Sequence, residues 1–202
     1  MFERPEGWLS PFPAADAKQI VAEIKRVGAK TILEFGPGDS TECFARMGME
    51  VTTCEHDPHW YDVAVERFKD TPNVKVLKFE NEMPVPPIAE LEYTKFDIAF
   101  VDAPQGYPMK RKKFKGYEDC SRLNTCLCAL ERCKLVILHD AVRGLERATL
   151  GRLNAMGYKF EHCMEYAKIW LPSPEPSLST EPSATLEPSQ KANHQMPIQP
   201  QP

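Results

Sequence analysis

Short apolar runs alternate with segments of helical periodicity along most of the chain, and no other feature of the sequence restricts the fold as strongly. Five of the runs have the length of buried strands and lie at residues 31–35, 51–54, 74–79, 96–101 and 134–138. Helical periodicity is found at residues 14–27, 41–47, 58–68, 118–132 and 142–156. Two further runs, 158–163 and 167–171, are close enough to pair with each other. Strands and helices in this order predict βαβ crossovers, so we expect an α/β fold whose doubly wound, mostly parallel sheet of seven strands ends in an antiparallel pair.

Proline content marks where the folding unit ends. Eight of the 19 prolines lie between Pro172 and Pro202, in a stretch that is rich in Ser, Glu and Gln and lacks apolar periodicity. Segments of this composition bury too little apolar surface to fold. We therefore expect one domain at residues 1–171 and a disordered tail at residues 172–202.

Charge and cysteine content exclude several classes of protein. The net charge of the 202 residues is −4, which argues against a nucleic-acid coat because such proteins need a basic excess. The seven cysteines form no spaced framework, which favours reduced thiols. No segment reaches the ~18–20 apolar residues of a membrane span, and the N-terminus lacks the charge order of a signal peptide. These features predict a cytoplasmic protein with no membrane partner.

A glycine-rich turn follows the first predicted strand. Residues 34–40 read Glu-Phe-Gly-Pro-Gly-Asp-Ser, and their two glycines allow a tight turn and a close approach of the backbone to a ligand. Ser40 is expected to cap the next helix. Position 41 is Thr where a dinucleotide fingerprint has its third glycine, which weakens a nicotinamide or flavin interpretation. A turn with no ligand is the alternative.

Acidic side chains follow the second and third predicted strands. Glu55 comes about 20 residues after the glycine turn, which is the spacing at which a carboxylate reaches ribose hydroxyls. Glu80 follows the third strand and is suited to contact an adenine edge. The alternative is that both are solvated loop carboxylates. Taken together with the glycine turn, they favour a nucleotide-like cofactor.

These segments resemble the class I S-adenosylmethionine-dependent methyltransferases over roughly residues 14–171. Residues 32–40 look like the family's first motif, Glu55 like its ribose-binding acid, and residues 96–104, Phe-Asp-Ile-Ala-Phe-Val-Asp-Ala-Pro, like its fourth. Within the family, the segments 101–107, 136–140 and 143–146 are most similar to the glucuronoxylan 4-O-methyltransferase group. The resemblance implies a Rossmann-like sheet and S-adenosylmethionine as the cofactor. The residues expected to contact this cofactor are Glu34, Gly36, Gly38, Ser40, Glu55 and Glu80.

Polar side chains also follow the fourth and fifth predicted strands. Methyl transfer to a hydroxyl needs a group that removes its proton, and Asp102, just past the fourth strand, is the first candidate for that role or for a metal ligand. His139 and Asp140 follow the fifth strand and are expected beside it as catalytic residues. Resemblance to metal-dependent O-methyltransferases implies Mg²⁺ or another hard cation at Asp102 and Asp140. The alternatives are an aspartate that caps a turn and a histidine that belongs to the core.

A basic run lies directly after the fourth strand. Tyr107, Lys110 and Arg111 are expected to bind the acceptor, and the positive charge favours an anionic acceptor such as a uronate sugar or a phosphorylated molecule. A solvated basic face is the alternative.

The sequence thus predicts an enzyme that methylates oxygen on a small-molecule or carbohydrate-like acceptor. The alternatives are a nicotinamide-dependent oxidoreductase, a non-catalytic nucleotide-binding module, and an RNA methyltransferase that uses the basic run.

Overall fold

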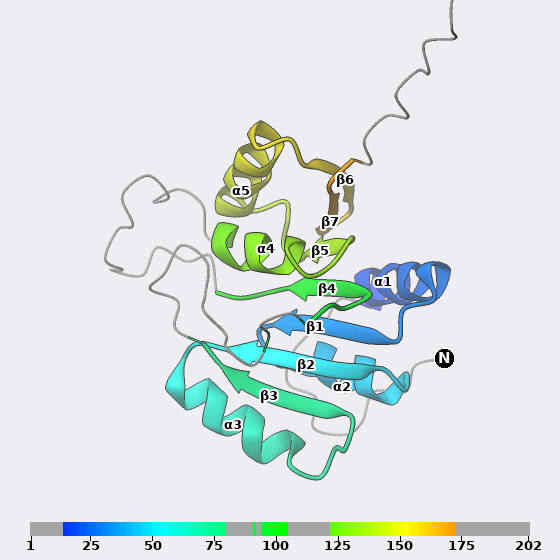
Figure 1. The fold of residues 1–202 in the computed structure, drawn as a ribbon, viewed down its shortest axis with the longest axis vertical. Helices are drawn as coiled ribbons and strands as arrows, with labels where there is room; N and C mark the ends of the chain where they lie inside the picture. Colours follow the sequence, from blue (N-terminus) through cyan, green and yellow to red (C-terminus); the bar gives the residue numbers. More distant parts are fainter. Residues whose placement is uncertain (1–13, 80–90, 92–93, 105–121, 173–202) are drawn as a thin grey trace, which may run out of the picture. The chain divides into compact units, whose positions relative to one another are not determined.

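The computed structural model describes residues 14–79, 91, 94–104 and 122–172 (Figure 1). Among them, five helices lie at Ala14–Val27 (α1), Asp39–Arg46 (α2), Pro58–Phe68 (α3), Leu123–Leu130 (α4) and Gly144–Ala155 (α5). Seven strands lie at Thr31–Phe35 (β1), Glu50–Glu55 (β2), Val74–Lys78 (β3), Ile98–Val101 (β4), Val136–Leu138 (β5), Lys159–Cys163 (β6) and Tyr166–Trp170 (β7). The predicted order of strands and helices is confirmed. The predicted tail at residues 172–202 lies, except for Pro172, outside the described residues.

All seven strands form one sheet in the order β3-β2-β1-β4-β5-β7-β6. The first five strands in this order are parallel, and β7 pairs antiparallel with both β5 and β6. The chain moves outward from β1 to β3 and then returns to β4 on the other side of β1, so the direction of winding reverses between β1 and β4. In open α/β sheets, ligands bind outside the carboxyl ends of the strands at such a reversal.

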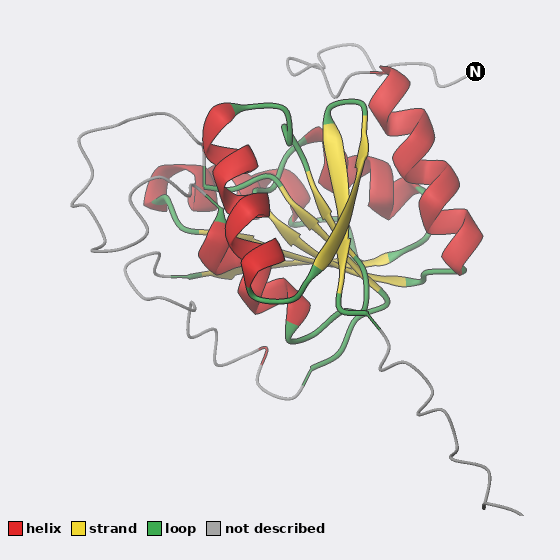
Figure 2. Cartoon of the chain, turned by 90° about the horizontal axis from the view of Figure 1, so that it is seen from above, coloured by secondary structure: helices red, strands yellow, loops and turns green. Residues whose placement is uncertain are grey.

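Helices cover both faces of the sheet (Figure 2). On one face, Ile20 and Ile24 of α1 and Phe44 of α2 pack against buried side chains of the strands. On the other face, side chains of α4 and α5, including Cys126 and Leu150, do the same. Because both faces are covered, the central strands consist of apolar runs rather than alternating patterns, and every residue of β4 and β5 is buried.

Several bounds differ by one or two residues from the sequence-based expectations, and two differences concern where a helix begins. Helix α2 begins at Asp39 and its N-cap is Gly38, so the predicted capping role of Ser40 is wrong. The reason is that the Thr41 hydroxyl, inside the helix, accepts a hydrogen bond from the Gly38 backbone N–H at 2.8 Å. Helix α4 begins at Leu123, later than the predicted residue 118, although residues 118–121 lie outside the described part of the chain.

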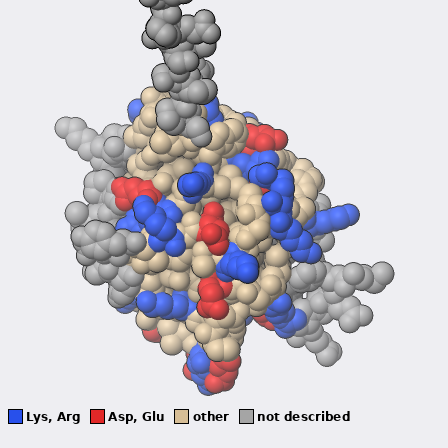
Figure 3. Space-filling view, turned by 45° about the vertical axis from the view of Figure 1, so that its right-hand side comes forward, with Lys and Arg blue, Asp and Glu red and all other residues tan. Residues whose placement is uncertain are grey.

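The surface shows no dominant charge where Figure 3 displays it, because Lys and Arg side chains are interspersed there with Asp and Glu. Among the described helices, none is long and apolar enough to cross a membrane. The six described cysteines are free, and five of them are buried. Burial raises the pKa of the Cys126 thiol to about 12, which keeps it protonated and unreactive.

Candidate active site

The turn after β1 requires glycine at its first position. Gly36 has a φ of +97°, in the left-handed region that side chains disfavour. A Cβ atom placed on Gly36 would lie 2.9 Å from the Cβ of Ala103 and 3.3 Å from the Ala103 backbone nitrogen. Gly36 therefore packs directly against Ala103, in the segment that follows β4. This contact holds the glycine turn next to the end of β4. Gly38 has open space around its Cα, since a Cβ there would meet nothing within 4 Å.

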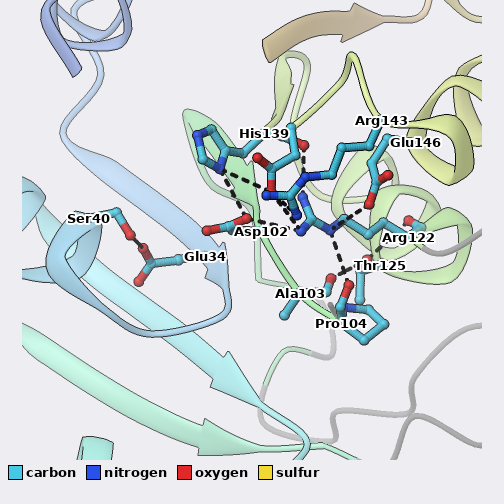
Figure 4. Close-up of polar contacts among 11 residues, drawn as sticks. Glu34, Ser40, Asp102, Ala103, Pro104, Arg122, Thr125, His139, Arg143 and Glu146 are labelled. Atoms are coloured by element: carbon cyan, nitrogen blue, oxygen red, sulfur yellow. Dashed lines mark hydrogen bonds and ion pairs between the residues drawn. The ribbon is translucent and has the colours of Figure 1, made fainter. Parts of the chain in front are cut away.

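Glu34 holds this turn from beneath. Its carboxylate is fully buried and accepts a hydrogen bond from the Ser40 hydroxyl (Figure 4) and another from the Thr41 hydroxyl, each at 2.5 Å. Burial raises the pKa of Glu34 to about 7, although both hydrogen bonds act in the opposite direction. The Thr41 hydroxyl also accepts from Gly38, so the residue that breaks the dinucleotide fingerprint connects the turn to the carboxylate. In this arrangement the side chains of Glu34 and Ser40 position the turn.

Glu55 ends β2 beside this turn. Its Oε1 accepts the backbone N–H groups of His56 and Asp57 at 2.7 and 2.8 Å, and it lies 2.8 Å from the His56 Nδ1. The side chain is only 8% exposed, so these contacts fix its orientation. All three contacts use Oε1, which leaves Oε2, among the described residues, as the oxygen that can accept a ligand hydroxyl.

Four of the predicted site residues lie outside the described part of the chain. They are Glu80, Tyr107, Lys110 and Arg111. Their predicted contacts with an adenine edge and with an anionic acceptor stay predictions.

The structure brings Asp102, His139 and Asp140 together, as the sequence predicts. Asp102 follows β4, and His139 and Asp140 follow β5. The His139 Nδ1 lies 3.1 Å from the Asp102 Oδ1 and 3.7 Å from the Asp140 Oδ2. The His139 ring also contacts the ring of Phe100, with the centroids 5.7 Å apart. The His139 imidazole and the Asp102 carboxylate therefore form a pair at the carboxyl ends of the adjacent strands β5 and β4.

The charges around this pair shift both pKa values. Burial acts most strongly on His139 and opposes its charge, but the hydrogen bond with Asp102 and the charges of Asp102 and Asp140 outweigh it and raise the pKa of His139. Burial likewise opposes the charge on Asp102, while the hydrogen bond with His139 and the charge of Arg122 outweigh it and lower the pKa of Asp102. Asp102 is consequently the weaker base of the two.

Arg122 is a site residue that the sequence interpretation missed. It immediately precedes α4 and its side chain is 1% exposed. Its Nη2 lies 3.1 Å from the Asp102 Oδ1 and 3.3 Å from the Asp140 Oδ2. The sequence does contain one signal for it, an arginine directly before the largely apolar segment 123–130, where a buried helix has no evident use for charge.

Asp140 is held by its backbone as well as by its side chain. Its φ is +55°, a left-handed conformation that aspartate tolerates better than most residues. The Arg143 N–H donates to the Asp140 carbonyl at 2.9 Å, and the Arg143 guanidinium lies 2.7 Å from the Asp140 carboxylate. With these contacts, the Asp140 carboxylate lies 3.3 Å from the Arg122 Nη2 and 3.7 Å from the His139 Nδ1.

The predicted metal site does not fit a hard cation. Asp102, His139 and Asp140 each offer one ligand atom, and these atoms lie within 4.8 Å of one another. However, the Asp102 oxygen is shared by Arg122 and His139, and the Asp140 oxygen by Arg122 and Arg143. Mg²⁺ and Ca²⁺ need several uncommitted oxygen ligands. Guanidinium groups already engage one oxygen of each carboxylate, Asp102 Oδ1 and Asp140 Oδ2, and these two oxygens also face His139.

Comparison with solved structures identifies the fold. An O-methyltransferase candidate from Klebsiella pneumoniae matches with a TM-score of 0.52 and 18% sequence identity, over 84% of this chain and 84% of that chain. A candidate caffeoyl-CoA O-methyltransferase from Staphylococcus aureus matches with a TM-score of 0.54 and 16% identity, over 86% and 85% of the two chains. The glycopeptide N-methyltransferase MtfA, complexed with S-adenosylmethionine, matches with a TM-score of 0.54 and 10% identity, over 82% and 91%.

Sequence comparison is less informative, since neither a protein-family model nor a curated protein matches this chain. The structural neighbours are class I S-adenosylmethionine-dependent methyltransferases, and at these identities they establish the fold alone. The finer resemblance to the glucuronoxylan group stays a prediction. The described part of the chain therefore has the Rossmann-like fold of the class I methyltransferases.

Proposed function

We propose that this chain is an S-adenosylmethionine-dependent methyltransferase that methylates a hydroxyl oxygen of a small-molecule or carbohydrate-like acceptor. The observation that carries the proposal is the pair formed by His139 and Asp102, 3.1 Å apart at the strand ends that adjoin the glycine turn. S-adenosylmethionine, when bound, supplies an electrophilic methyl group on a sulfonium. The pair supplies the base that an O-methylation needs.

The β1 and β2 ends would hold the cofactor. The turn at Gly36 and Gly38 offers backbone groups without obstructing side chains, and the space above Gly38 is open. Glu55, at the end of the neighbouring strand, offers the Oε2 atom to the ribose hydroxyls. Glu34, Ser40 and Thr41 would act indirectly, because they keep the turn in its conformation.

His139 would act as the general base. When its Nδ1–H donates to Asp102, the lone pair lies on Nε2, an atom that is buried in the structure. The acceptor hydroxyl would have to reach this atom and give up its proton to it as the oxygen attacks the methyl carbon. Asp102 stays ionised because its pKa is lowered by His139 and Arg122, and it stabilises the imidazolium that forms. We therefore assign the proton transfer to His139, with Asp102 as the residue that orients it.

The acceptor is proposed to be anionic in part because of residues outside the described structure. Lys110 and Arg111 belong to the basic run that follows β4 in the sequence, close to Asp102 along the chain. The similarity of residues 101–107 to the glucuronoxylan group supports a uronate-bearing saccharide as one member of this acceptor class.

Binding of S-adenosylhomocysteine, the product form of the cofactor, is the first test. In isothermal titration calorimetry we expect saturable one-to-one binding well below about 1 mM, whereas NAD should not bind in the same range. Methyl transfer is then assayed with a panel of hydroxylated acceptors, with and without carboxylate groups. Folded protein that does not bind S-adenosylhomocysteine at millimolar concentration would contradict the proposal, and preferential binding of NAD would favour an oxidoreductase.

A further inference from the structure

We propose that Arg122 serves as the fixed cation of the acceptor site, where it takes the place of a divalent metal and positions Asp102 and Asp140. This inference rests on the proposed function for its catalytic meaning. The charge arrangement that it describes can be tested without any methyl acceptor.

The contacts of Arg122 come from three segments that are separate in the sequence. Its guanidinium lies near two carbonyl oxygens and three carboxylates: Pro104 O at 3.1 Å, His139 O at 2.8 Å, Asp102 Oδ1 at 3.1 Å, Asp140 Oδ2 at 3.3 Å and Glu146 Oε1 at 3.6 Å. These groups follow β4, follow β5 and lie in α5, so one side chain joins the elements that surround the predicted acceptor position (Figure 4).

Arg122 is built into the core rather than placed on the surface. Its side chain is 1% exposed, and Glu146 beneath it is fully buried. The Thr125 hydroxyl, within hydrogen-bond distance of the carbonyls of Ala103 (2.9 Å) and Arg122 (3.1 Å), anchors α4 to the segment after β4. Entry of a metal ion would require the guanidinium to leave the carboxylates. It cannot leave them without disrupting the packing around it.

The guanidinium groups beside the carboxylates also disfavour a divalent ion. The cluster contains the carboxylates of Asp102, Asp140 and Glu146 and the guanidinium groups of Arg122 and Arg143. A divalent ion at Asp140 Oδ2 would face both guanidinium groups, and one at Asp102 Oδ1 would face Arg122. A planar guanidinium with five N–H donors satisfies several oxygens at once, which is the role that a metal has in a carboxylate site.

Manganese binding to the intact, untreated protein is the first test. Electron paramagnetic resonance of Mn²⁺ should show no site tighter than about 1 mM, and methyl transfer should change by less than about twofold after chelation or addition of Mg²⁺. A Mn²⁺ site with micromolar affinity that is lost in Asp102→Asn would overturn the inference. Mn²⁺ binding is measured on the protein alone, so a failed methyl-transfer assay would count against the proposed function and not against the fixed cation.

Substitution of Arg122 provides the second test. Arg122→Gln should lower kcat by about 100-fold or more and change the KM for S-adenosylmethionine by less than about threefold, because the defect lies in positioning at the acceptor end. It should also bind Mn²⁺ at least about tenfold more tightly than the parent protein, since two carboxylates have lost their partner. A merely structural role would predict no gain of Mn²⁺ binding.

Two further variants complete the design. Arg122→Lys keeps the charge and the fold but loses the planar geometry, so it should retain more activity than Arg122→Gln and gain no Mn²⁺ affinity. If Arg122→Lys gained Mn²⁺ affinity as strongly as Arg122→Gln, the positive charge would not be what excludes the metal, and the inference would fail. The exposed Arg147 of α5 provides the control, and Arg147→Gln should leave both quantities unchanged.

Discussion

The ends of β1 and β2 and the ends of β4 and β5 lie on one edge of the same sheet, but they manage buried charge in opposite ways. Beneath the glycine turn, the Glu34 carboxylate is surrounded by hydroxyl donors, and burial raises its pKa to about 7. After β4 and β5, the carboxylates are paired with guanidinium groups and imidazole, and Asp102 has a lowered pKa.

This difference corresponds to two kinds of task. A cofactor can be recognised by backbone shape and one carboxylate, so the β1 and β2 ends need rigidity and little net charge. Proton transfer to His139 needs an unprotonated imidazole held close to an ionised carboxylate, and in a buried site that carboxylate requires positive charges as partners. The two pairs of strand ends can be altered separately, so each serves as the reference for the other.

The largest effect is expected at the acceptor end. His139→Gln should lower kcat by about 10²- to 10⁴-fold, because the general base is lost, while the Kd of S-adenosylhomocysteine stays within about twofold. Steady-state kinetics and calorimetry measure the two quantities. His162→Gln, which alters an exposed histidine of β6, is the control and should change neither. Retention of at least half the activity in His139→Gln would move the proton to Asp102 or to another group.

Glu34 should make stability depend on pH at the cofactor end. Its pKa is about 7 in the folded protein and near 4.5 when unperturbed, so its contribution to stability is complete below about pH 4.5 and is lost as the pH rises through 7. The shift corresponds to at most about 3.5 kcal/mol. Urea unfolding at a series of pH values should show this dependence in the parent protein and a flatter curve in Glu34→Gln.

The control for Glu34→Gln is Glu66→Gln, whose side chain is 74% exposed. This variant should keep the pH dependence of the parent protein. If Glu34→Gln also kept the pH dependence of the parent protein, Glu34 would ionise normally. The ends of β1 and β2 would then not differ from the ends of β4 and β5 in how they hold a buried carboxylate.

A smaller effect is expected at Glu55, on cofactor affinity alone. Glu55→Ala should weaken binding of S-adenosylhomocysteine by about 1–3 kcal/mol, which is the range for a lost hydrogen bond to a charged group. Calorimetry measures it, with Glu50→Ala at the exposed start of the same strand as the control. Unchanged affinity in Glu55→Ala would mean that the ribose contact lies elsewhere.

The smallest effect is expected from removal of the tail. A chain that ends at Pro172 should keep the parent free energy of unfolding and the parent affinity for S-adenosylhomocysteine, because all residues assigned to either end precede it. Urea unfolding and calorimetry are the measurements. Loss of folding on truncation would contradict the predicted domain boundary at residue 171.

Much of this architecture follows from local patterns in the sequence. The runs at 31–35 and 51–54 predict β1 and β2 within two residues, and helices α1 and α3 have the predicted bounds. Placement of Asp102, His139 and Asp140 at one edge follows from parallel strands, whose carboxyl ends lie side by side. The cap of α2 was predicted incorrectly because Thr41 accepts from Gly38, while the Ser40 hydroxyl donates to Glu34, a residue of the preceding strand. Local capping propensity, which favours Ser, does not include that contact.

The sequence by itself determined the order of strands and helices, the glycine turn and the edge at which the polar residues gather, because apolar periodicity and glycine's φ are properties of neighbouring residues. The tertiary structure decided how charge is used there: that Glu34 supports the turn, and that Arg122 rather than an ion joins Asp102 to Asp140. A charge is stabilised by whichever groups surround it in three dimensions. For Arg122 those groups come from segments that no local pattern connects.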